Sequence, residues 1–297
     1  MLTVFGSVAI DTIRTPSRII KNALGGAATY AAVSACFFQK PCLIAVVGHD
    51  FPKNYQAVLN KFVDTKGVVH ASGRTFRYDG SYDQTLSSRT TNKTELNVLK
   101  DFRPIVPDEY RKSEFVYLAN NDPSQNTKII KEFDRVKFSM CDTIDFWIST
   151  KRNDVIKMMG AVDSVVINDE EAKLLTKTHN LIKAAKKIME WGTRFVIIKK
   201  GEHGSLLFYD DIVFPSPAFS LENIVDPTGA GDSFAGGMIG YMASKNSTKL
   251  STIREAAVYG NVMGSFAVEK YGIAGLLNLR KSRIQNRFKR YRKMVHF

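Results

Sequence analysis

The most informative segment of this chain is residues 226–237, Asp226-Pro227-Thr228-Gly229-Ala230-Gly231-Asp232-Ser233-Phe234-Ala235-Gly236-Gly237. Apolar Ile224 and Val225 precede it, and apolar residues follow it at helical spacing, so the segment predicts a strand, a glycine-rich turn and a helix. Gly229 and Gly231 let backbone N–H groups approach an anion without a Cβ in the way. The helix dipole adds about half a positive charge at the same place. We therefore predict a phosphate-binding turn.

Asp232 is an acidic residue at the rim of this predicted phosphate site, where its charge would repel the ligand. A carboxylate makes chemical sense there if it accepts the proton of a hydroxyl group that attacks the phosphate. The alternative is an ordinary first-turn acid that the helix dipole favours. With a pKa of about 4, Asp232 would be a weak base, so proton transfer would come late in the reaction.

The segment is similar, position by position, to the C-terminal signature of the ribokinase-like (PfkB-type) carbohydrate kinases. The resemblance implies a kinase that uses ATP and Mg²⁺ and phosphorylates a hydroxyl group of a small sugar. Asp232 would be its base, and the N–H groups of Gly229, Ala230 and Gly231 would form its anion hole. Two alternatives stay open: an adenosine-like nucleoside kinase of the same family, and a non-catalytic metabolite-binding relative that acts through a partner.

The rest of the chain alternates strand-like and helix-like patterns, which predicts an α/β fold with a doubly wound, mostly parallel sheet flanked by helices. We expect one domain over residues 1–297. The predicted strands are 2–10, 42–48, 115–119, 136–141, 164–167, 195–199 and 205–209. The predicted helices are 26–38, 52–62, 126–134, 152–160, 169–176, 181–191, 231–243, 252–269 and 280–297. Ligands of such sheets collect at the carboxyl ends of strands, where we place Asp11, Asn168, Lys199 and Asp226.

Residues 67–97 interrupt this alternation. They are polar, contain the turn dipeptide Asp79-Gly80, and alternate in a way that favours hairpin strands. We predict a small β-sheet lid, joined by residues near 12–20, that covers the substrate and excludes water. The alternative is a surface β-meander without a function. Because Phe76, Tyr78 and Tyr82 and open strand edges would be exposed in a monomer, we predict a homodimer through the lid.

The resemblance covers most of the chain and implies an acceptor site. Asp11 matches the first-strand carboxylate that binds sugar hydroxyls, and Gly25 and Gly26 match paired glycines that let the backbone approach the substrate. The sequence departs from the family at Ala27, where ribose-binding relatives have lysine, and at Tyr30, where relatives have asparagine. With Phe76, Tyr78 and Tyr82 of the lid, Tyr30 could stack on a flat group, as a nucleoside kinase requires. The alternative is that these aromatic residues belong to the core.

The resemblance also implies a nucleotide site and two cation sites. No Walker A loop or dinucleotide-binding glycine motif is present, so other residues must hold the nucleotide. The implied nucleotide contacts are Asn168, Lys199, Gly201, Gly204 and Asn261. Glu171 would order the water around Mg²⁺, which keeps much of its hydration in proteins. Residues matching a monovalent cation site, for K⁺, are Asp226, Thr228, Ala267 and Gly272.

Charge and cysteine content restrict the partners of the protein. The net charge is +13, but eight of the 42 Lys and Arg residues lie in 280–297, which holds no acid and has apolar residues at helical spacing. We interpret this tail as a docked helix with a solvated basic face, and we expect neither nucleic acid nor membrane as a partner. Three cysteines without a metal-binding spacing, and no secretory signal, favour the cytoplasm.

Overall fold

The computed structural model describes residues 1–295, and its centre is a nine-stranded sheet. The strands are β1 (Leu2–Phe5), β4 (Cys42–Gly48), β5 (Asp64–Ala71), β8 (Phe115–Leu118), β9 (Phe138–Cys141), β10 (Ser164–Asn168), β11 (Phe195–Lys199), β12 (Ser205–Tyr209) and β13 (Ile212–Ser216). Their order is β13-β12-β11-β10-β9-β8-β1-β4-β5, with parallel pairing from β11 to β5 and antiparallel pairing of β12 and β13. The predicted mostly parallel α/β sheet is confirmed.

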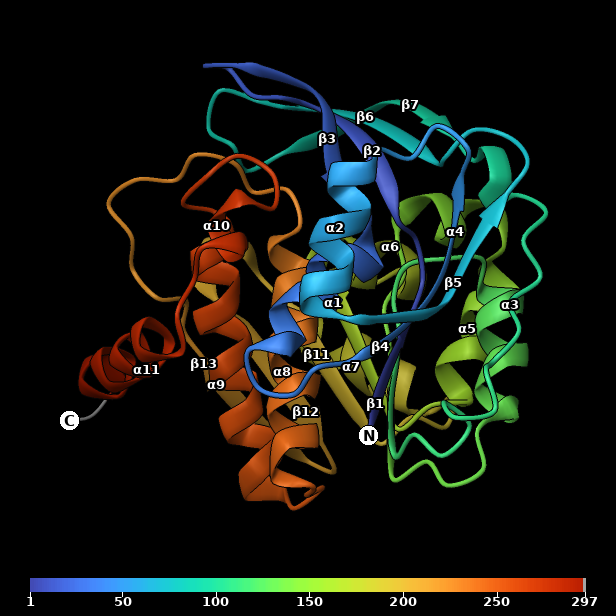
Figure 1. The fold of residues 1–297 in the computed structure, drawn as a ribbon. Coiled ribbons are helices and arrows are strands. Elements are labelled where there is room, and N and C mark those ends of the chain that lie inside the picture. The colour runs from blue at the N-terminus through green and yellow to red at the C-terminus, as the bar shows by residue number, and fades with distance from the viewer. Residues whose placement is uncertain (296–297) are drawn as a thin grey trace.

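Helices cover both faces of this sheet (Figure 1). One face carries α1 (Ala27–Cys36), α2 (Lys53–Phe62), α8 (Ala230–Lys245), α9 (Leu250–Ala267) and α10 (Ala274–Leu277). The other carries α3 (Pro123–Ile129), α4 (Asp145–Thr150), α5 (Arg152–Gly160), α6 (Asp169–Thr176) and α7 (Leu181–Met189). The sequence of β4 is a continuous apolar run because both of its faces are buried: Leu43 packs on the first face of the sheet and Ile44 on the second.

A separate four-stranded sheet, the small sheet, lies across the carboxyl ends of the central strands (Figure 1). Its strands are β2 (Ala9–Arg14), β3 (Ile19–Gly25), β6 (Arg77–Tyr82) and β7 (Arg89–Glu95), in the order β3-β2-β6-β7. The sheet combines the N-terminal hairpin with the inserted hairpin, which agrees with the predicted contribution of residues near 12–20.

Two strand predictions at the small sheet need correction. The predicted strand 2–10 is two strands, because the chain leaves the central sheet at Gly6, packed against Ala119, and enters the small sheet at Ala9. Residues 67–71 belong to β5 of the central sheet, not to the small sheet. This segment, Gly67-Val68-Val69-His70-Ala71, is mostly apolar, and it pairs with β4 at the edge of the central sheet.

Two further segments differ from the predictions. The strand predicted before the glycine-rich turn does not form: residues 217–228 are irregular, and Val225 N–H donates to Val268 O at 2.8 Å. The predicted helix 126–134 ends early, because α3 stops at Ile129 and a 3₁₀ turn follows over Ile130–Glu132.

The C-terminal helix α11 (Lys281–Val295) is docked as predicted, with Ile284 and Tyr291 buried against the core. Residues 296–297 of the predicted tail lie outside the described range. Over residues 1–295, no helix combines the length and the apolar character needed to span a membrane.

Candidate active site

The glycine-rich turn forms the N-terminus of α8. Gly229 precedes the helix with φ of 74°, and a Cβ at this position would contact the Tyr30 ring at 2.3 Å. Ala230 N–H donates to Pro227 O at 3.1 Å, so it is not free, contrary to the prediction of three anion-binding donors. Within the described residues, the N–H groups of Gly229 and Gly231 have no such acceptor. These two groups and the helix dipole make this turn the candidate anion hole.

Asp232 lies in the first turn of α8, next to the anion hole. Its pKa is raised to about 6, first because burial removes water from the carboxylate and second because Asp142 carries a like charge nearby. Lys199 and Arg89 oppose this rise. Asp232 is therefore a better base at neutral pH than the predicted pKa of about 4 implied, because its proton affinity is closer to the ambient pH.

Lys199, the last residue of β11, lies close to Gly231 of the candidate anion hole. Its Nζ would be 2.9 Å from a Cβ at Gly231, so a side chain there would displace the amine. Burial alone lowers the pKa of Lys199, but the carboxylates around it, with Asp142 the strongest, raise the pKa above its ordinary value. Lys199 is therefore a charged group close to Gly231.

Asp142 is a site residue that the sequence analysis missed. It follows β9 directly and is 4% exposed. Its carboxylate accepts hydrogen bonds from Lys199 Nζ at 2.8 Å, Thr143 N–H at 2.7 Å and Tyr117 O–H at 3.4 Å. Its position after a buried strand, in line with Asn168 and Lys199, was the signal that could have identified it.

Asn168 and Glu171 form a capping box at the start of α6. Asn168 Oδ1 accepts from Glu171 N–H at 2.7 Å, and Glu171 Oε2 accepts from Asn168 N–H at 3.0 Å. Burial, and next the charge of Asp142, raise the pKa of Glu171 to about 8. Because burial makes the negative charge of Glu171 unfavourable, a cation nearby would stabilise the ionised carboxylate. The helix cap and the predicted Mg²⁺ role are therefore compatible.

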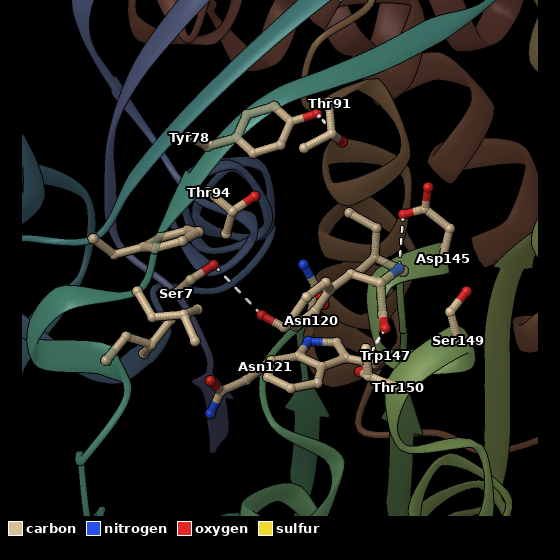
Figure 2. A pocket seen from close by; sticks show the side chains of 15 residues that line it. Ser7, Tyr78, Thr91, Thr94, Asn120, Asn121, Asp145, Trp147, Ser149 and Thr150 are labelled. Carbon is tan, nitrogen blue, oxygen red and sulfur yellow. Dashed lines mark hydrogen bonds between the residues drawn. The ribbon is translucent and has the colours of Figure 1, made fainter.

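A cavity of about 320 Å³ lies between the small sheet, the end of β8 and α4. Figure 2 shows Tyr78 and Thr91 of the small sheet on one side, and Asn120, Asn121 and Trp147 on the opposite side. Phe76 and Tyr78 thus line a cavity, as predicted for acceptor contacts, and Phe146 and Trp147 of α4 add two aromatic rings that the sequence analysis missed. Asp232 is not among the lining residues.

The other predicted acceptor residues lie next to this cavity rather than on its wall. Asp11 lies in β2 and is 4% exposed, and its Oδ1 has no hydrogen-bond partner in the described part of the chain. Burial raises the pKa of Asp11 to about 7; the Gly26 N–H opposes this, and the charges of Asp232 and Asp226 add to it. An unpaired buried carboxylate near Asp232 is suited to binding a hydroxyl group.

Gly25, Gly26 and Tyr30 have structural roles that differ from the predicted ones. A Cβ at Gly25 would lie 1.8 Å from the Asp11 carboxylate, and one at Gly26 would lie 2.5 Å from Ser7 O. The glycines thus make room for Asp11 and for the crossing strand. Tyr30 is 1% exposed and packs under Gly229, so it does not line the cavity and its ring is not available for stacking on a flat ligand.

The remaining predicted nucleotide residues lie at the β11–β13 end of the sheet. Gly201 and Gly204 have φ of 53° and 85°, and Gly204 lies so close to Ser216 O that a Cβ would be 2.2 Å away. Asn261 is 9% exposed, and its amide donates to Ser216 Oγ at 2.8 Å and Ser205 Oγ at 3.2 Å. Its amide hydrogens are thus used within the protein.

Asp226, Thr228 and Gly272, predicted for a monovalent cation, lie together. The buried Asp226 carboxylate accepts from Thr228 N–H at 2.9 Å and from Gly272 N–H at 2.7 Å. Ala267 ends α9, and its carbonyl lies close to Gly275. The structure gives no contact between Ala267 and the other three residues.

Comparison with known proteins gives consistent matches. Residues 1–278 match the family model described as pfkB family carbohydrate kinase. A cytidine kinase of Thermococcus kodakarensis is 32% identical over 254 residues, covering 80% of this chain and 87% of that protein. An inositol 3-kinase of Arabidopsis thaliana is 24% identical over 277 residues, covering 91% of this chain and 74% of that protein.

Solved structures show the same fold. The nucleoside kinase of Methanocaldococcus jannaschii, an archaeal member of the ribokinase family, superposes with a TM-score of 0.77 at 20% identity, over 97% of this chain and 98% of that one. The fructokinase of Vibrio cholerae, in its form with fructose, ADP and calcium ion, gives 0.78 at 20% identity, also over 97% and 98%. The expected ribokinase-like fold is confirmed.

Proposed function

Because this chain belongs to the pfkB family of carbohydrate kinases, we propose that it transfers the γ-phosphate of ATP to a hydroxyl group of a small sugar, either free or carrying a base. The observation that carries the proposal is the position of Asp232, with its raised pKa, in the first turn of α8, where Lys199 Nζ lies close to Gly231. The relatives are named as kinases, so a non-catalytic metabolite-binding protein is not favoured.

The donor side of the site fits the triphosphate of ATP. The N–H groups of Gly229 and Gly231 and the Lys199 ammonium present positive charge toward one point. Glu171 would hold Mg²⁺ through its water, and Asp142 would add a second carboxylate to that shell. When bound, Mg²⁺ would neutralise charge on the phosphates. Asn168, Gly201, Gly204 and Asn261 remain our proposal for the rest of the nucleotide site.

Asp232 performs the proton step of the proposed reaction. The acceptor O–H bond breaks as its oxygen forms a bond to the γ-phosphorus, and the proton passes to the Asp232 carboxylate. The bond from the γ-phosphorus to the oxygen bridging to the β-phosphate breaks, and ADP leaves with that electron pair. Asp232 then loses the proton to water, and Asp11 orients the acceptor through its unpaired oxygen.

The cavity favours a nucleoside over a free sugar as the acceptor. It is lined by four aromatic side chains, Phe76, Tyr78, Phe146 and Trp147, and by the amides of Asn120 and Asn121. Aromatic walls with a few amide groups suit a flat, polar ring, whereas a free sugar would leave these walls without a matching face. The small sheet would act as the lid that closes this cavity and excludes water.

Release of ADP, measured with ATP and Mg²⁺ across a panel of acceptors, tests the proposal. The panel contains ribose, fructose, adenosine, inosine and cytidine, and the Asp232→Asn variant gives the background. We expect turnover with a nucleoside at least ten times that with either sugar. Turnover with the free sugars alone would reject the nucleoside, and no turnover above the Asp232→Asn background would reject the proposed activity.

Three accompanying proposals concern conditions and assembly. K⁺ would bind near Asp226, Thr228 and Gly272, and Ala267 would supply a carbonyl; a flat response of turnover to K⁺ against choline would reject this site. A homodimer would form through the small sheet. The cytoplasm would be the location, which is supported by the free thiols of Cys36, Cys42 and Cys141.

A further inference from the structure

Arg89 is a cation of the small sheet that the proposed mechanism does not yet use. It is the first residue of β7, and the strand register places it directly opposite Tyr82 of β6. The Tyr82 hydroxyl accepts from Thr228 Oγ1 at 3.2 Å, and Thr228 precedes Gly229 of the anion hole. The pairing of β6 and β7 therefore puts Arg89 on the strand position next to a tyrosine that contacts the turn before the anion hole.

The Arg89 side chain is held in a fixed position on the cavity side of the site. Its Nη2 lies 3.6 Å from Asp145 Oδ1, and its guanidinium carbon lies 5.7 Å above the centre of the Tyr78 ring. Both Tyr78 and Asp145 line the cavity. At the same time, the Arg89 charge opposes the rise in the pKa of Asp232. Arg89 thus contacts two residues of the cavity wall, and its charge acts on the proposed base.

We propose that Arg89 is a catalytic residue: its guanidinium pairs with the phosphoryl group during transfer, on the side opposite to Lys199. Stacking on Tyr78 leaves the in-plane N–H groups of Arg89 available, and this planar fork matches the oxygen atoms of a phosphoryl group. Lys199 is fixed by Asp142 on the central sheet, whereas Arg89 belongs to the small sheet. The negative charge of the transferring phosphoryl group would therefore meet both cations only when the small sheet covers the acceptor. The inference rests on the proposed kinase activity.

The competing explanation gives Arg89 a purely supporting role. In that case its ion pair with Asp145 keeps the cavity wall in place, and Arg89 never contacts phosphate. The two roles predict different kinetic effects. A contact made to the transferring group lowers kcat, whereas a displaced cavity wall raises the KM for the acceptor.

The variants Arg89→Gln and Arg89→Lys test the proposal, with Lys93→Gln as the matched control. Lys93 is on the same strand, is 66% exposed and pairs only with its neighbour Glu95 within the described residues. We expect Arg89→Gln to lower kcat by about 100-fold or more and to change the acceptor KM by less than threefold. Arg89→Lys should retain part of the activity, because it keeps the charge without the planar fork. Lys93→Gln should match the unsubstituted protein.

A binding measurement separates this inference from the proposed activity. Calorimetry would compare the affinity for ADP alone with that for ADP and aluminium fluoride, which imitates the transferring phosphoryl group. Arg89→Gln should weaken only the second. An unchanged kcat, or a raised KM at unchanged kcat, would overturn the catalytic role of Arg89. Absence of turnover in the unsubstituted protein would instead overturn the proposed activity. An equal affinity of both proteins for ADP with aluminium fluoride would overturn the contact between Arg89 and the phosphoryl group.

Discussion

The chemistry of Asp232 depends on a small number of charged neighbours. Desolvation and the charge of Asp142 raise its pKa to about 6, while Lys199 and Arg89 lower it. The carboxylate is therefore ionised at neutral pH and still able to accept a proton. Lys199 is also close to Gly231, so in the proposed mechanism one charged neighbour acts on both the base and the candidate anion hole.

Replacing Asp232 with Asn tests the base directly. The amide preserves the shape but cannot accept the proton, so we expect kcat to fall by about 100-fold or more, with the affinity for ATP changed little. Steady-state ADP release and calorimetric titration with ATP measure the two quantities. Asp211→Asn, at a residue whose side chain is 96% exposed, is the control. Unchanged turnover in Asp232→Asn would remove this residue from the mechanism.

The raised pKa of Asp232 predicts a pH dependence. Because only the ionised carboxylate accepts a proton, kcat/KM should rise with pH and level off above about 6. Asp142→Asn removes the negative charge that contributes to the rise, so the limb of the profile should move to lower pH. Profiles of both proteins between pH 4.5 and 8.5, a range of about 4 units that brackets the limb, measure this shift. A limb that stays in place or moves upward would contradict the assignment.

Candidate site residues could be predicted where they stand in a local sequence motif, and not where spatial neighbours alone bring them to the site. Asp232, Lys199 and Asn168 each stand in a recognisable motif. The structure places Asp232 in the first turn of α8, Lys199 close to Gly231, and Asn168 next to Lys199 in the strand register. Asp142 has no motif around it, because its role arises from the alignment of β9 with β11 in space. Tyr30 was misplaced for a similar reason: nothing local indicates that its ring lies under Gly229.

At the scale of elements, α11 is the clearest example of a helix that is attached to the site. Tyr291 O–H donates to Pro217 O at 2.8 Å and also contacts Ser216 Oγ at 2.8 Å, and Ser216 in turn accepts from Asn261. Arg287 Nη2 lies 2.6 Å from Glu269 Oε1, and its guanidinium lies 3.6 Å from the centre of the Phe266 ring. The helix therefore supports the proposed nucleotide side of the site.

Arg287→Met measures this attachment. Methionine keeps the apolar stem but leaves Glu269 without its buried partner, so we expect the free energy of unfolding to fall by about 2 kcal/mol. Urea unfolding followed by circular dichroism gives the value. Arg292→Met, at an exposed position of the same helix, should change stability by less than about 0.5 kcal/mol. Equal losses in the two variants would show that the Arg287 contacts do not stabilise the docked helix.

The sequence did not predict the sheet of those strands whose pairing depends on residues far away in the chain. Residues 2–10 are mostly apolar, yet they form β1 and β2 in two different sheets, on either side of Gly6. Residues 67–71 directly precede the polar hairpin in the sequence, but they pair with β4 at the edge of the central sheet. The spacing of apolar residues indicates which side of an element is buried, but it does not indicate the sheet to which a strand belongs.

At the scale of the whole molecule, the predicted dimer now rests on strand edges alone. Phe76 and Tyr78 face the cavity and Tyr82 contacts Thr228, so the small sheet does not expose them as an apolar face. The edges of β3 and β7 remain unpaired within the described chain. We expect light scattering to give twice the chain mass of 33.3 kDa at micromolar concentration. A fully active monomer would rule out a shared lid.

The position of β1 in the centre of the large sheet has a consequence for biosynthesis. Its partners are β4 and β8, so β1 leaves the ribosome well before Phe115–Leu118, with which it must pair. Loop closure over so long a separation is slow, and parallel pairing cannot begin from a local hairpin. The segment Leu2–Phe5 therefore lacks its β8 neighbour until more than a third of the chain has been made. A nascent chain of this protein is a natural client for chaperones that bind short apolar segments until the far half of the sheet has emerged.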